Sequence, residues 1–332
     1  MEITVLNQDE VRELLPMDEC IEVMEAALAS LARGEVLLPL RQITWLPDGR
    51  SALATMPAYA GHLGAVGVKV ITIFPGNEGT ELDAHQGAVL LFETERGRPL
   101  LLCDATEVTA IRTAAVSGVA TRHLAREDAR DLAILGSGTQ ARSHLEAMLA
   151  VRDVRSVRVW SRTEEHSRTF AERELEARGL TIEVAPTAED AVRGADLVCT
   201  TTSARDPVLL GEWLAPGTHV NAVGFSGRDG REVDTEAVRR ARLYVDRRES
   251  AVKEKGDVVI PIEEGSIGED HIAGELGEVL IGTAPGRSSS EEITLFESAG
   301  LAIEDLASAH HLYEKAKEKG IGTRVELGGQ RA

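Results

Sequence analysis

At 332 residues the chain is longer than a single hydrophobic core usually supports, so two domains are expected. Its 43% hydrophobic and 27% charged residues are typical of a soluble globular protein, and a formal net charge of −19 disfavours a polyanionic partner such as nucleic acid. No apolar run approaches the roughly 20 residues that cross a membrane, and residues 1–15 lack a signal-peptide pattern. Three widely separated cysteines predict core thiols in a reducing cytoplasm, and the carboxylates form no metal-binding pattern.

The first third of the chain is predicted to be rich in strands. Residues 18–33 have helical periodicity, with Asp18 placed to cap the helix and Gly34 placed to end it. A further helix is expected at 106–125. Alternating and β-branched residues between turn signals predict strands at 37–47, 51–60 and 64–74 and a hairpin at 87–104.

From residue 129 strands alternate with helices over about 100 residues. Strands are predicted at 131–136, 154–161, 181–186, 196–202 and 218–224, with helices at 139–151, 164–175 and 187–195 between the first four. This alternation predicts an α/β fold with a Rossmann-type doubly wound parallel sheet. A further strand is expected at 241–247.

The C-terminal segment is predicted to rejoin the N-terminal domain. Residues 300–320 form an amphipathic helix, and 321–327 resemble a strand. We therefore expect a discontinuous α+β domain at 1–118 and 305–332, and a Rossmann domain at 119–304.

A glycine-rich turn predicts dinucleotide binding. The segment "DLAILGSGTQA" places Gly136-x-Gly138-x-x-Ala141 after a strand and at the start of a helix, with Thr139 and Gln140 in the first helical turn. Gly136 permits a tight turn, Gly138 lets the backbone approach a pyrophosphate, and Ala141 allows close packing of the helix on the sheet. A purely structural glycine turn is the alternative.

The end of the second strand of this fold contacts the adenosine ribose, and an acid there selects NAD(H). This chain has "VWSRT" at that place, without an acid at 160–163. Arg162 can pair with a 2′-phosphate, and Ser161 and Thr163 can donate hydrogen bonds to it, so NADP(H) is preferred over NAD(H). A solvated surface arginine is the alternative. Thr200, at the carboxyl end of a later strand, is also expected at the cofactor.

Together, several motifs resemble the ornithine cyclodeaminase/mu-crystallin family from nearly end to end. These are "LPLRQITWLPDG", "ATMPAY", "GVKV", "HQGAVLLFE", "AIRTAAVSGVAT", "LGSGTQA", "VWSRT", "HVNAVG", "REVD" and "GLAIEDLASA". The resemblance implies a Rossmann domain, a substrate and dimerisation domain, and a homodimer. It also implies that Asn221 and Val223 face the nicotinamide. Activities in the family include ornithine cyclodeamination, alanine dehydrogenation and ketimine reduction.

The same resemblance implies that Arg41, Lys69 and Arg112 hold the substrate carboxylate. Lys69 shares a strand face with Ile71 and Ile73, so a half-buried ammonium there needs an anionic partner. Arg112 interrupts a helix of small, apolar residues, and guanidinium groups suit bidentate capture of a carboxylate. The alternative is that both arginines form structural ion pairs and Lys69 extends to solvent.

A departure from the cyclodeaminase pattern favours the reductase branch. Cyclodeaminases of the family carry an acid/base aspartate where this chain has Ser226, and a hydroxyl cannot take that proton near neutral pH. His85 is a candidate proton donor or polar contact; a solvated turn histidine is the alternative. We therefore expect an NAD(P)H-dependent reductase of imino acids and cyclic ketimines, reversible as an amino acid dehydrogenase. A cyclodeaminase-type lyase with recycled NAD and a non-enzymatic cofactor-binding protein are the alternatives.

Overall fold

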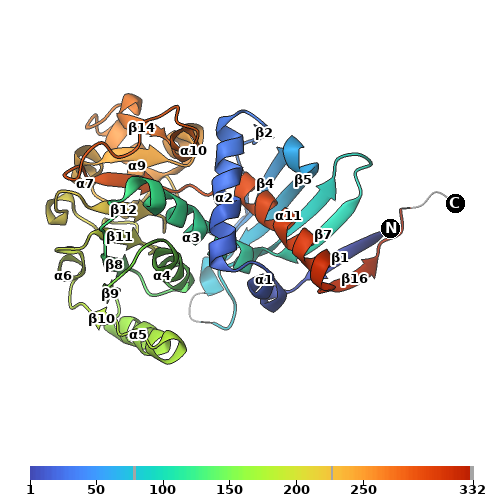
Figure 1. The fold of residues 1–332 in the computed structure, drawn as a ribbon, viewed down its shortest axis with the longest axis horizontal. Helices are drawn as coiled ribbons and strands as arrows, with labels where there is room; N and C mark the ends of the chain where they lie inside the picture. Colours follow the sequence, from blue (N-terminus) through green and yellow to red (C-terminus); the bar gives the residue numbers. More distant parts are fainter. Residues whose placement is uncertain (78–79, 226, 330–332) are drawn as a thin grey trace. The chain divides into compact units, whose positions relative to one another are not determined.

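The computed structural model describes residues 1–77, 80–225 and 227–329, so Ser226 lies outside the described residues. The chain forms two compact units. The first comprises Met1–Arg112 and Gly300–Ala332, and the second comprises Thr113–Ala299. Figure 1 shows the elements of each unit.

The described residues of the first unit form an eight-stranded, largely antiparallel sheet. Its order is β16-β1-β7-β6-β5-β4-β2, with β3 also paired to β4. The C-terminal strand β16 pairs with the N-terminal β1, so the two ends of the chain meet in one sheet (Figure 1). The strands are β1 (Glu2–Leu6), β2 (Val36–Leu37), β3 (Gln42–Trp45), β4 (Ala52–Ala60), β5 (Ala65–Ile73), β6 (His85–Glu93), β7 (Pro99–Asp104) and β16 (Thr323–Glu326).

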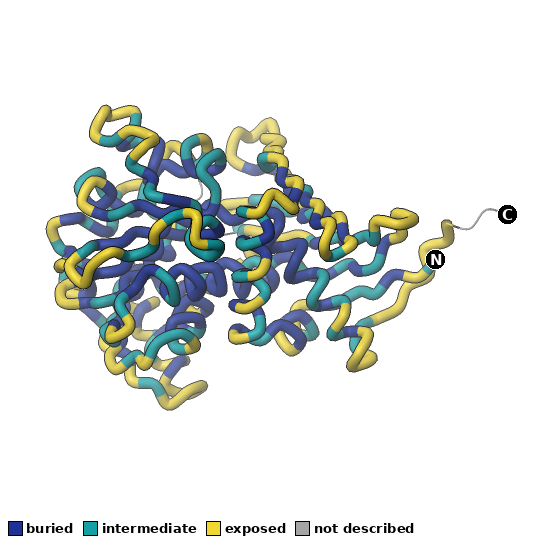
Figure 2. The backbone as a smooth tube through the Cα atoms, turned by 45° about the horizontal axis from the view of Figure 1, so that its top comes forward, coloured by how far each residue is buried: buried dark blue, intermediate teal, exposed yellow. Residues whose placement is uncertain are grey.

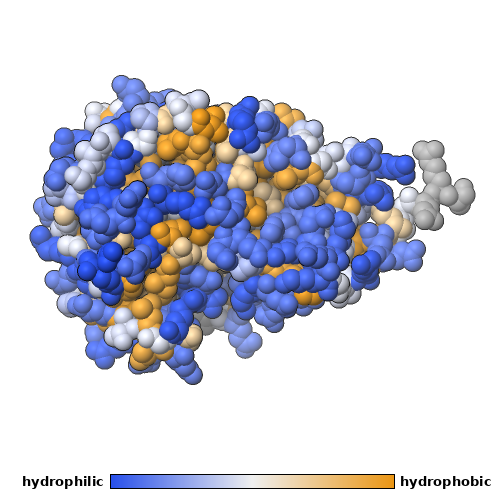
Figure 3. All heavy atoms as spheres, viewed as in Figure 1, coloured by the Kyte–Doolittle hydropathy of each residue, from blue (hydrophilic) through white to orange (hydrophobic). Residues whose placement is uncertain are grey.

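Helix α11 (Ala302–Lys319) covers one face of this sheet. It packs on β4, β5 and β6 and against α2 (Met17–Ala32), as Figure 1 shows. Close packing is possible because the inward side of β4 is mostly alanine and because β5 has Gly67, where a Cβ would lie 2.8 Å from Leu306 Cδ1. Helix α1 (Gln8–Leu14) and the short 3-10 helices η1 (Gly61–Leu63) and η2 (Pro75–Asn77) complete the unit. Over α11 the surface is mostly hydrophilic (Figure 3).

The structure corrects one helix cap and confirms another. Asp18 is not the cap of α2: Pro16 occupies that position with φ −62°, and Asp18 lies inside the first turn. Pro16 itself has an extended backbone with ψ 151°, and Asp18 lies near the positive end of the helix dipole. Gly34 follows the C-terminal cap with φ +74°, as expected for a residue that ends a helix.

The second unit confirms the doubly wound parallel sheet. Its strands are all parallel in the order β10-β9-β8-β11-β12-β15-β13-β14. The first five follow the 3-2-1-4-5 order of dinucleotide-binding folds, whose topological switch here lies between β8 and β11, and the last strand in the chain, β15, takes the sixth place, before β13 and β14. The strands are β8 (Asp131–Leu135), β9 (Ser156–Trp160), β10 (Glu183–Val184), β11 (Leu197–Thr200), β12 (His219–Ala222), β13 (Arg242–Val245), β14 (Ile272–Glu275) and β15 (Thr294–Glu297).

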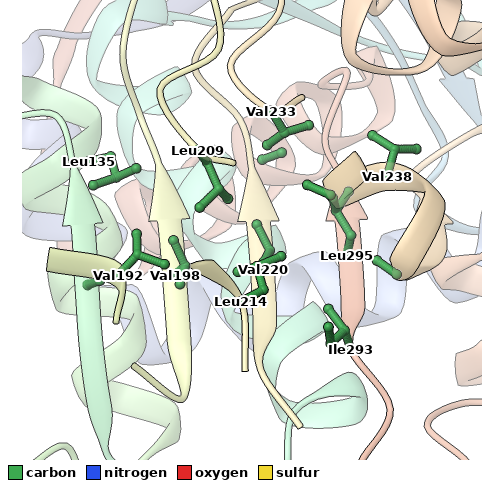
Figure 4. Close-up of a cluster of buried hydrophobic side chains, with 14 of the residues drawn as sticks. Leu135, Val192, Val198, Leu209, Leu214, Val220, Val233, Val238, Ile293 and Leu295 are labelled. Carbon is green, nitrogen blue, oxygen red and sulfur yellow. The ribbon is translucent and has the colours of Figure 1, made fainter. Parts of the chain in front are cut away.

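Helices lie on both faces of this sheet. Buried side chains from β8, β11, β12 and β15 form a cluster with Val192 of α6 and Val238 of α7 on one face (Figure 4). On the other face Asn221 contacts α3 and α4. Figure 2 shows the sheet as a buried centre. The helices are α3 (Ala105–Leu124), α4 (Thr139–Val151), α5 (Glu164–Arg178), α6 (Ala188–Val192), η3 (Gly211–Trp213), α7 (Thr235–Arg240), α8 (Arg248–Glu254), α9 (Gly256–Glu263), η4 (Glu269–His271) and α10 (Leu276–Leu280).

Sequence interpretation missed β14 and β15. Each has four residues, and β15 is buried along its whole length, so it shows no alternation of polar and apolar residues. Within the described part of the chain, every helix is too short or too polar to cross a lipid bilayer.

Candidate functional site

The glycine-rich turn between β8 and α4 is tightly packed on one side. Gly136 has φ +123°, and a Cβ there would lie 2.5 Å from Thr201 Oγ1 and 2.8 Å from the Thr201 carbonyl oxygen. Thr201 in turn donates its N–H and hydroxyl to the carbonyl oxygen of Leu135. Both the backbone conformation and the neighbouring loop therefore require glycine at 136.

On its other side the turn is open. Gly138 is the N-terminal cap of α4, nothing lies within 4 Å of the place of a Cβ, and no described side chain caps the helix. Thr139 and Gln140 form the first turn, while Ala141 is completely buried against the sheet. An uncapped helix start with open space before it fits the phosphates of a dinucleotide.

The segment after β9 leaves Arg162 exposed. Among the described residues, no acid pairs with this guanidinium. Ser161 donates its hydroxyl to the Thr163 carbonyl oxygen at 2.8 Å and lies 2.9 Å from Ser167 Oγ. Thr163 is the N-terminal cap position of α5.

Two of the residues expected at the cofactor have their side chains inside the protein. Thr200 is fully buried and donates its hydroxyl to Glu232 Oε2 at 2.9 Å. Asn221 is also fully buried and donates to Thr121 Oγ1 at 2.9 Å. Val223 lies just past the end of β12, where its N–H donates to the Thr200 carbonyl oxygen. Thr200 and Val223 are therefore at the carboxyl edge of the sheet, but the Thr200 and Asn221 side chains are occupied there.

The first unit buries Lys69 under α11. The Lys69 ammonium lies 2.9 Å from the Asp305 carboxylate and 3.3 Å from Thr109 Oγ1, and its side chain is 1% exposed. It lies on the inward side of β5, opposite Met56 of β4 and Val89 of β6. Lys69 therefore does not extend to solvent.

Arg112 and Arg41 reach the same region from other segments. Arg112 donates from Nε to Asp305 at 3.0 Å and from Nη1 to Glu304 at 2.6 Å. Arg41 donates from Nη2 to the Gly300 carbonyl oxygen at 2.8 Å. Gly300 has φ +73°, and a Cβ there would lie 2.8 Å from Arg112 Nη1, so this glycine is needed for both reasons. We call Arg41, Lys69, Arg112, Glu304 and Asp305 the cation-rich cluster.

Lys69, Arg112, Glu304 and Asp305 of this cluster are buried, whereas Arg41 is partly buried. Burial lowers the pKa of Lys69 to about 8; Asp305 raises it, while Arg112 and Arg41 lower it further. Lys69 is therefore mostly protonated at neutral pH but gives up its proton far more easily than an exposed lysine. Such a group can hold an anion and can act as an acid.

His85 begins β6 on the same inward side as Lys69, opposite Ile73. A large part of the residue is exposed, yet desolvation and then the positive charge of Lys69 lower its pKa, while Asp83 raises it. The imidazole is therefore within electrostatic range of Lys69.

Sequence reasoning missed Glu304 and Asp305. Their signal was two consecutive acids in "GLAIEDLASA", at the start of a helix that otherwise buries small and apolar residues. Among the described residues, no group of three or more His, Cys, Asp and Glu side chains is arranged to hold a metal ion.

Comparisons with known proteins place these features in context. The model of the ornithine cyclodeaminase/mu-crystallin family matches residues 1–320. Ketimine reductase mu-crystallin of Mus musculus is 40% identical over 313 residues, which are 93% of this chain and 96% of the relative.

Two solved structures are also similar. Thermococcus litoralis Delta(1)-pyrroline-2-carboxylate reductase in complex with NADH and L-proline has a TM-score of 0.95 and 40% identity, covering 97% of this chain and 100% of that one. An archaeal alanine dehydrogenase dimer with bound NAD has a TM-score of 0.93 and 36% identity, covering 99% and 100%. The chain belongs to the ornithine cyclodeaminase/mu-crystallin family.

Proposed function

We propose that the protein is an NAD(P)H-dependent reductase of 2-imino carboxylates, including cyclic ketimines, that yields L-amino or cyclic imino acids. Run in reverse, the same reaction is that of an amino acid dehydrogenase. The relatives named as reductases of Delta(1)-pyrroline-2-carboxylate and of ketimines, and as an alanine dehydrogenase, support this class of substrate.

The observation in the structure that supports the proposal is the convergence of three basic side chains, Arg41, Lys69 and Arg112, within the first unit. Guanidinium and ammonium groups that lie together suit a carboxylate ligand, because they form charge-assisted hydrogen bonds to it. A neutral or cationic ligand would not form these charge-assisted bonds.

Within the cluster the residues have different roles. Arg41 and Arg112 orient the carboxylate, because planar guanidinium groups suit it. Lys69 donates a proton toward the imine nitrogen, since its pKa of about 8 lets it be protonated at pH 7 and still release the proton. His85 is the second candidate donor. The bound cofactor supplies the hydride.

The second unit holds the cofactor. The first turn of α4, from Gly138 through Thr139, Gln140 and Ala141, takes the phosphates, and the close packing at Gly136 fixes the turn. Thr200, Asn221 and Val223 shape the carboxyl edge, the first two through their internal hydrogen bonds.

We further propose that NADP(H) is preferred, with NAD(H) as the alternative. Arg162 is exposed and Ser161 and Thr163 accompany it, so a 2′-phosphate would meet a cation. The first acid of α5, Glu164, is paired with Arg168 at 2.6 Å, which reduces its repulsion of a phosphate. The two solved relatives contain NADH or NAD, so the support for this preference comes from this chain's own residues alone.

We also propose that the protein is a homodimer in the cytoplasm, with the first unit as the substrate and dimerisation domain. The sheet face away from α11 exposes apolar side chains from β2, β4 and β5, namely Leu37, Leu53, Tyr59, Val66 and Val70. A contiguous apolar sheet face is typical of an interface between copies. Light scattering should give the mass of two chains; the mass of one would refute the dimer.

An assay of cofactor oxidation tests the function. The protein is mixed with NADPH or NADH and with cyclic imine carboxylates, or with 2-oxo acids plus ammonia, and the loss of reduced cofactor is followed. Release of ammonia from ornithine without cofactor oxidation would show a lyase instead. Cofactor binding without any turnover would show a binding protein.

A further inference from the structure

The second unit contains a buried group of charges that the proposed chemistry does not use. Glu232, Lys255, Asp257 and Glu297 are each at most 1% exposed. The Lys255 ammonium lies 2.9 Å from Glu297, at the end of β15, and donates to the Phe225 carbonyl oxygen at 2.5 Å. We call these four residues the acid-rich cluster.

Glu232 accepts hydrogen bonds from two loops at once. From the end of β11 it receives the hydroxyl of Thr200 at 2.9 Å, and from the loop after β11 the hydroxyl and the N–H of Thr202, both at 2.6 Å. From the loop after β12 it receives the Gly224 N–H at 2.6 Å. The two backbone N–H groups can only donate, one to each carboxylate oxygen, so both oxygens of Glu232 act as acceptors.

The two loops touch at this point. A Cβ on Gly224 would lie 2.1 Å from the Thr202 carbonyl oxygen, 2.4 Å from the Thr202 nitrogen and 2.7 Å from Glu232 Oε1. Between Thr200 and Thr202 stands Thr201, the residue that packs against Gly136 of the phosphate-binding turn. Glu232 therefore fixes the relative positions of the segments that follow β8, β11 and β12.

Hydrogen bonds also hold the backbone of Glu232 in place. Asp257, in the first turn of α9, accepts the backbone N–H groups of Glu232 and Val233 at 2.8 and 2.9 Å. The carbonyl oxygen of Glu232 accepts from the N–H groups of Val208 and Leu209. Glu232 is thus immobilised at its backbone while its side chain reaches the two loops.

We propose that Glu232 is a positioning residue for the nicotinamide end of the cofactor: by clamping Thr200, Thr202 and Gly224 it fixes the loops after β11 and β12. These strands lie on the nicotinamide-binding half of a doubly wound sheet, and ligands bind at the carboxyl ends of its strands. Glu232 does not touch the cofactor. The inference rests on the cofactor binding proposed above.

The test compares the whole cofactor with a fragment that lacks nicotinamide. Glu232→Gln keeps the shape but replaces one acceptor oxygen by an NH2 group, which then faces a backbone N–H. Affinities are measured by calorimetry for NADPH and for 2′-phospho-ADP-ribose, with NADH and ADP-ribose run in parallel. The comparison uses whichever of NADPH and NADH the wild-type protein binds more tightly, together with the fragment of that cofactor that lacks nicotinamide. We expect Glu232→Gln to bind the cofactor about tenfold more weakly than wild type does, and its affinity for the fragment to change less than about twofold.

Glu174→Gln is the matched control. Glu174 is also a buried glutamate of the second unit, paired with Arg178 at 2.9 Å, but it lies on α5, away from the clamp. Glu174→Gln should lower the unfolding temperature, and its affinities for the cofactor and for the fragment should change by the same factor. Equal losses for cofactor and fragment in Glu232→Gln, or no loss for either, would overturn the proposal.

Thr200→Val provides the test if Glu232→Gln does not fold. It removes one hydroxyl donor and should weaken the reduced cofactor about threefold with an unchanged fragment affinity; an unchanged cofactor affinity would overturn the clamp. The readout needs no turnover. A wild-type protein that binds no dinucleotide would contradict the proposed function itself, whereas normal binding by both variants would contradict only the role of Glu232.

Discussion

The two units each contain a cluster of charged side chains, and the two clusters are built from different groups. The cation-rich cluster combines Arg41, Lys69 and Arg112 with two carboxylates. The acid-rich cluster combines Lys255 with three carboxylates. Buried charges of either sign need partners, because burial without a partner is costly.

The acid-rich cluster finds its compensation within the protein. Glu232 and Asp257 accept backbone N–H groups, and burial raises the pKa of Glu297 well above its ordinary value, although Lys255 opposes this. In the cation-rich cluster Lys69 and Arg112 pair with Asp305 and Glu304, and Arg41 donates to a backbone carbonyl oxygen. The two clusters thus differ in their donors: backbone N–H groups hold the acids of the acid-rich cluster, whereas the donors of the cation-rich cluster are basic side chains, which also suit a ligand carboxylate.

The largest expected effect comes from the lysine of the cation-rich cluster. Lys69→Met removes the proposed proton donor while keeping a side chain of similar length, so kcat should fall by about 10²–10⁴-fold. Steady-state kinetics and a thermal unfolding curve are the measurements. A folded variant with full activity would remove Lys69 from the chemistry.

A second substitution tests the balance of charges. Asp305→Asn takes one of the two carboxylates from beside Lys69 and Arg112, and breaking a buried pair costs about 3–5 kcal/mol of unfolding free energy. Urea unfolding measures the loss. Glu164→Gln, which breaks the exposed pair with Arg168, should change stability little. Equal effects of the two would mean that the buried pairs of Asp305 contribute no more to stability than an exposed pair.

The pH dependence of reduction tests whether Lys69 supplies the proton. Its pKa is lowered from 10.5 to about 8, so the ammonium is present below pH 8 and is lost above it. The kcat for reduction should therefore fall by about tenfold per pH unit above pH 8. The kcat of Lys69→Arg should show no such fall above pH 8. A wild-type profile that stays flat to pH 10 would show that the proton comes from elsewhere.

The smallest predicted effect is a change in the affinity for the cofactor. Arg162→Ala should weaken NADPH binding about tenfold and NADH binding less than about twofold, since only NADPH carries the 2′-phosphate. Arg173→Ala, at an exposed arginine further along α5, is the control. Equal weakening of both cofactors would place the phosphate away from Arg162.

Local signals in the sequence predicted much of this molecule. The turn from Gly136 to Ala141 and the alternation of strands and helices each depend on neighbouring residues, and the structure confirms the fold they predicted. The ion pair of Lys69 with Asp305 joins residues 236 positions apart, so no local pattern announces it. Glu232 was missed for a similar reason, because its partners Thr200 and Thr202 are about 30 residues away and only the sheet brings them together.

The most direct test of the central claim compares two forms of one imine. Oxidation of NADPH is followed with Delta(1)-pyrroline-2-carboxylate and with its methyl ester, which has the same ring and imine but no negative charge. Reduction of the carboxylate, with the ester reduced at least about 100-fold more slowly, is the result that a cation-rich cluster holding the substrate predicts. Equal rates for the two forms, or ammonia release from ornithine with no oxidation of cofactor, would contradict it.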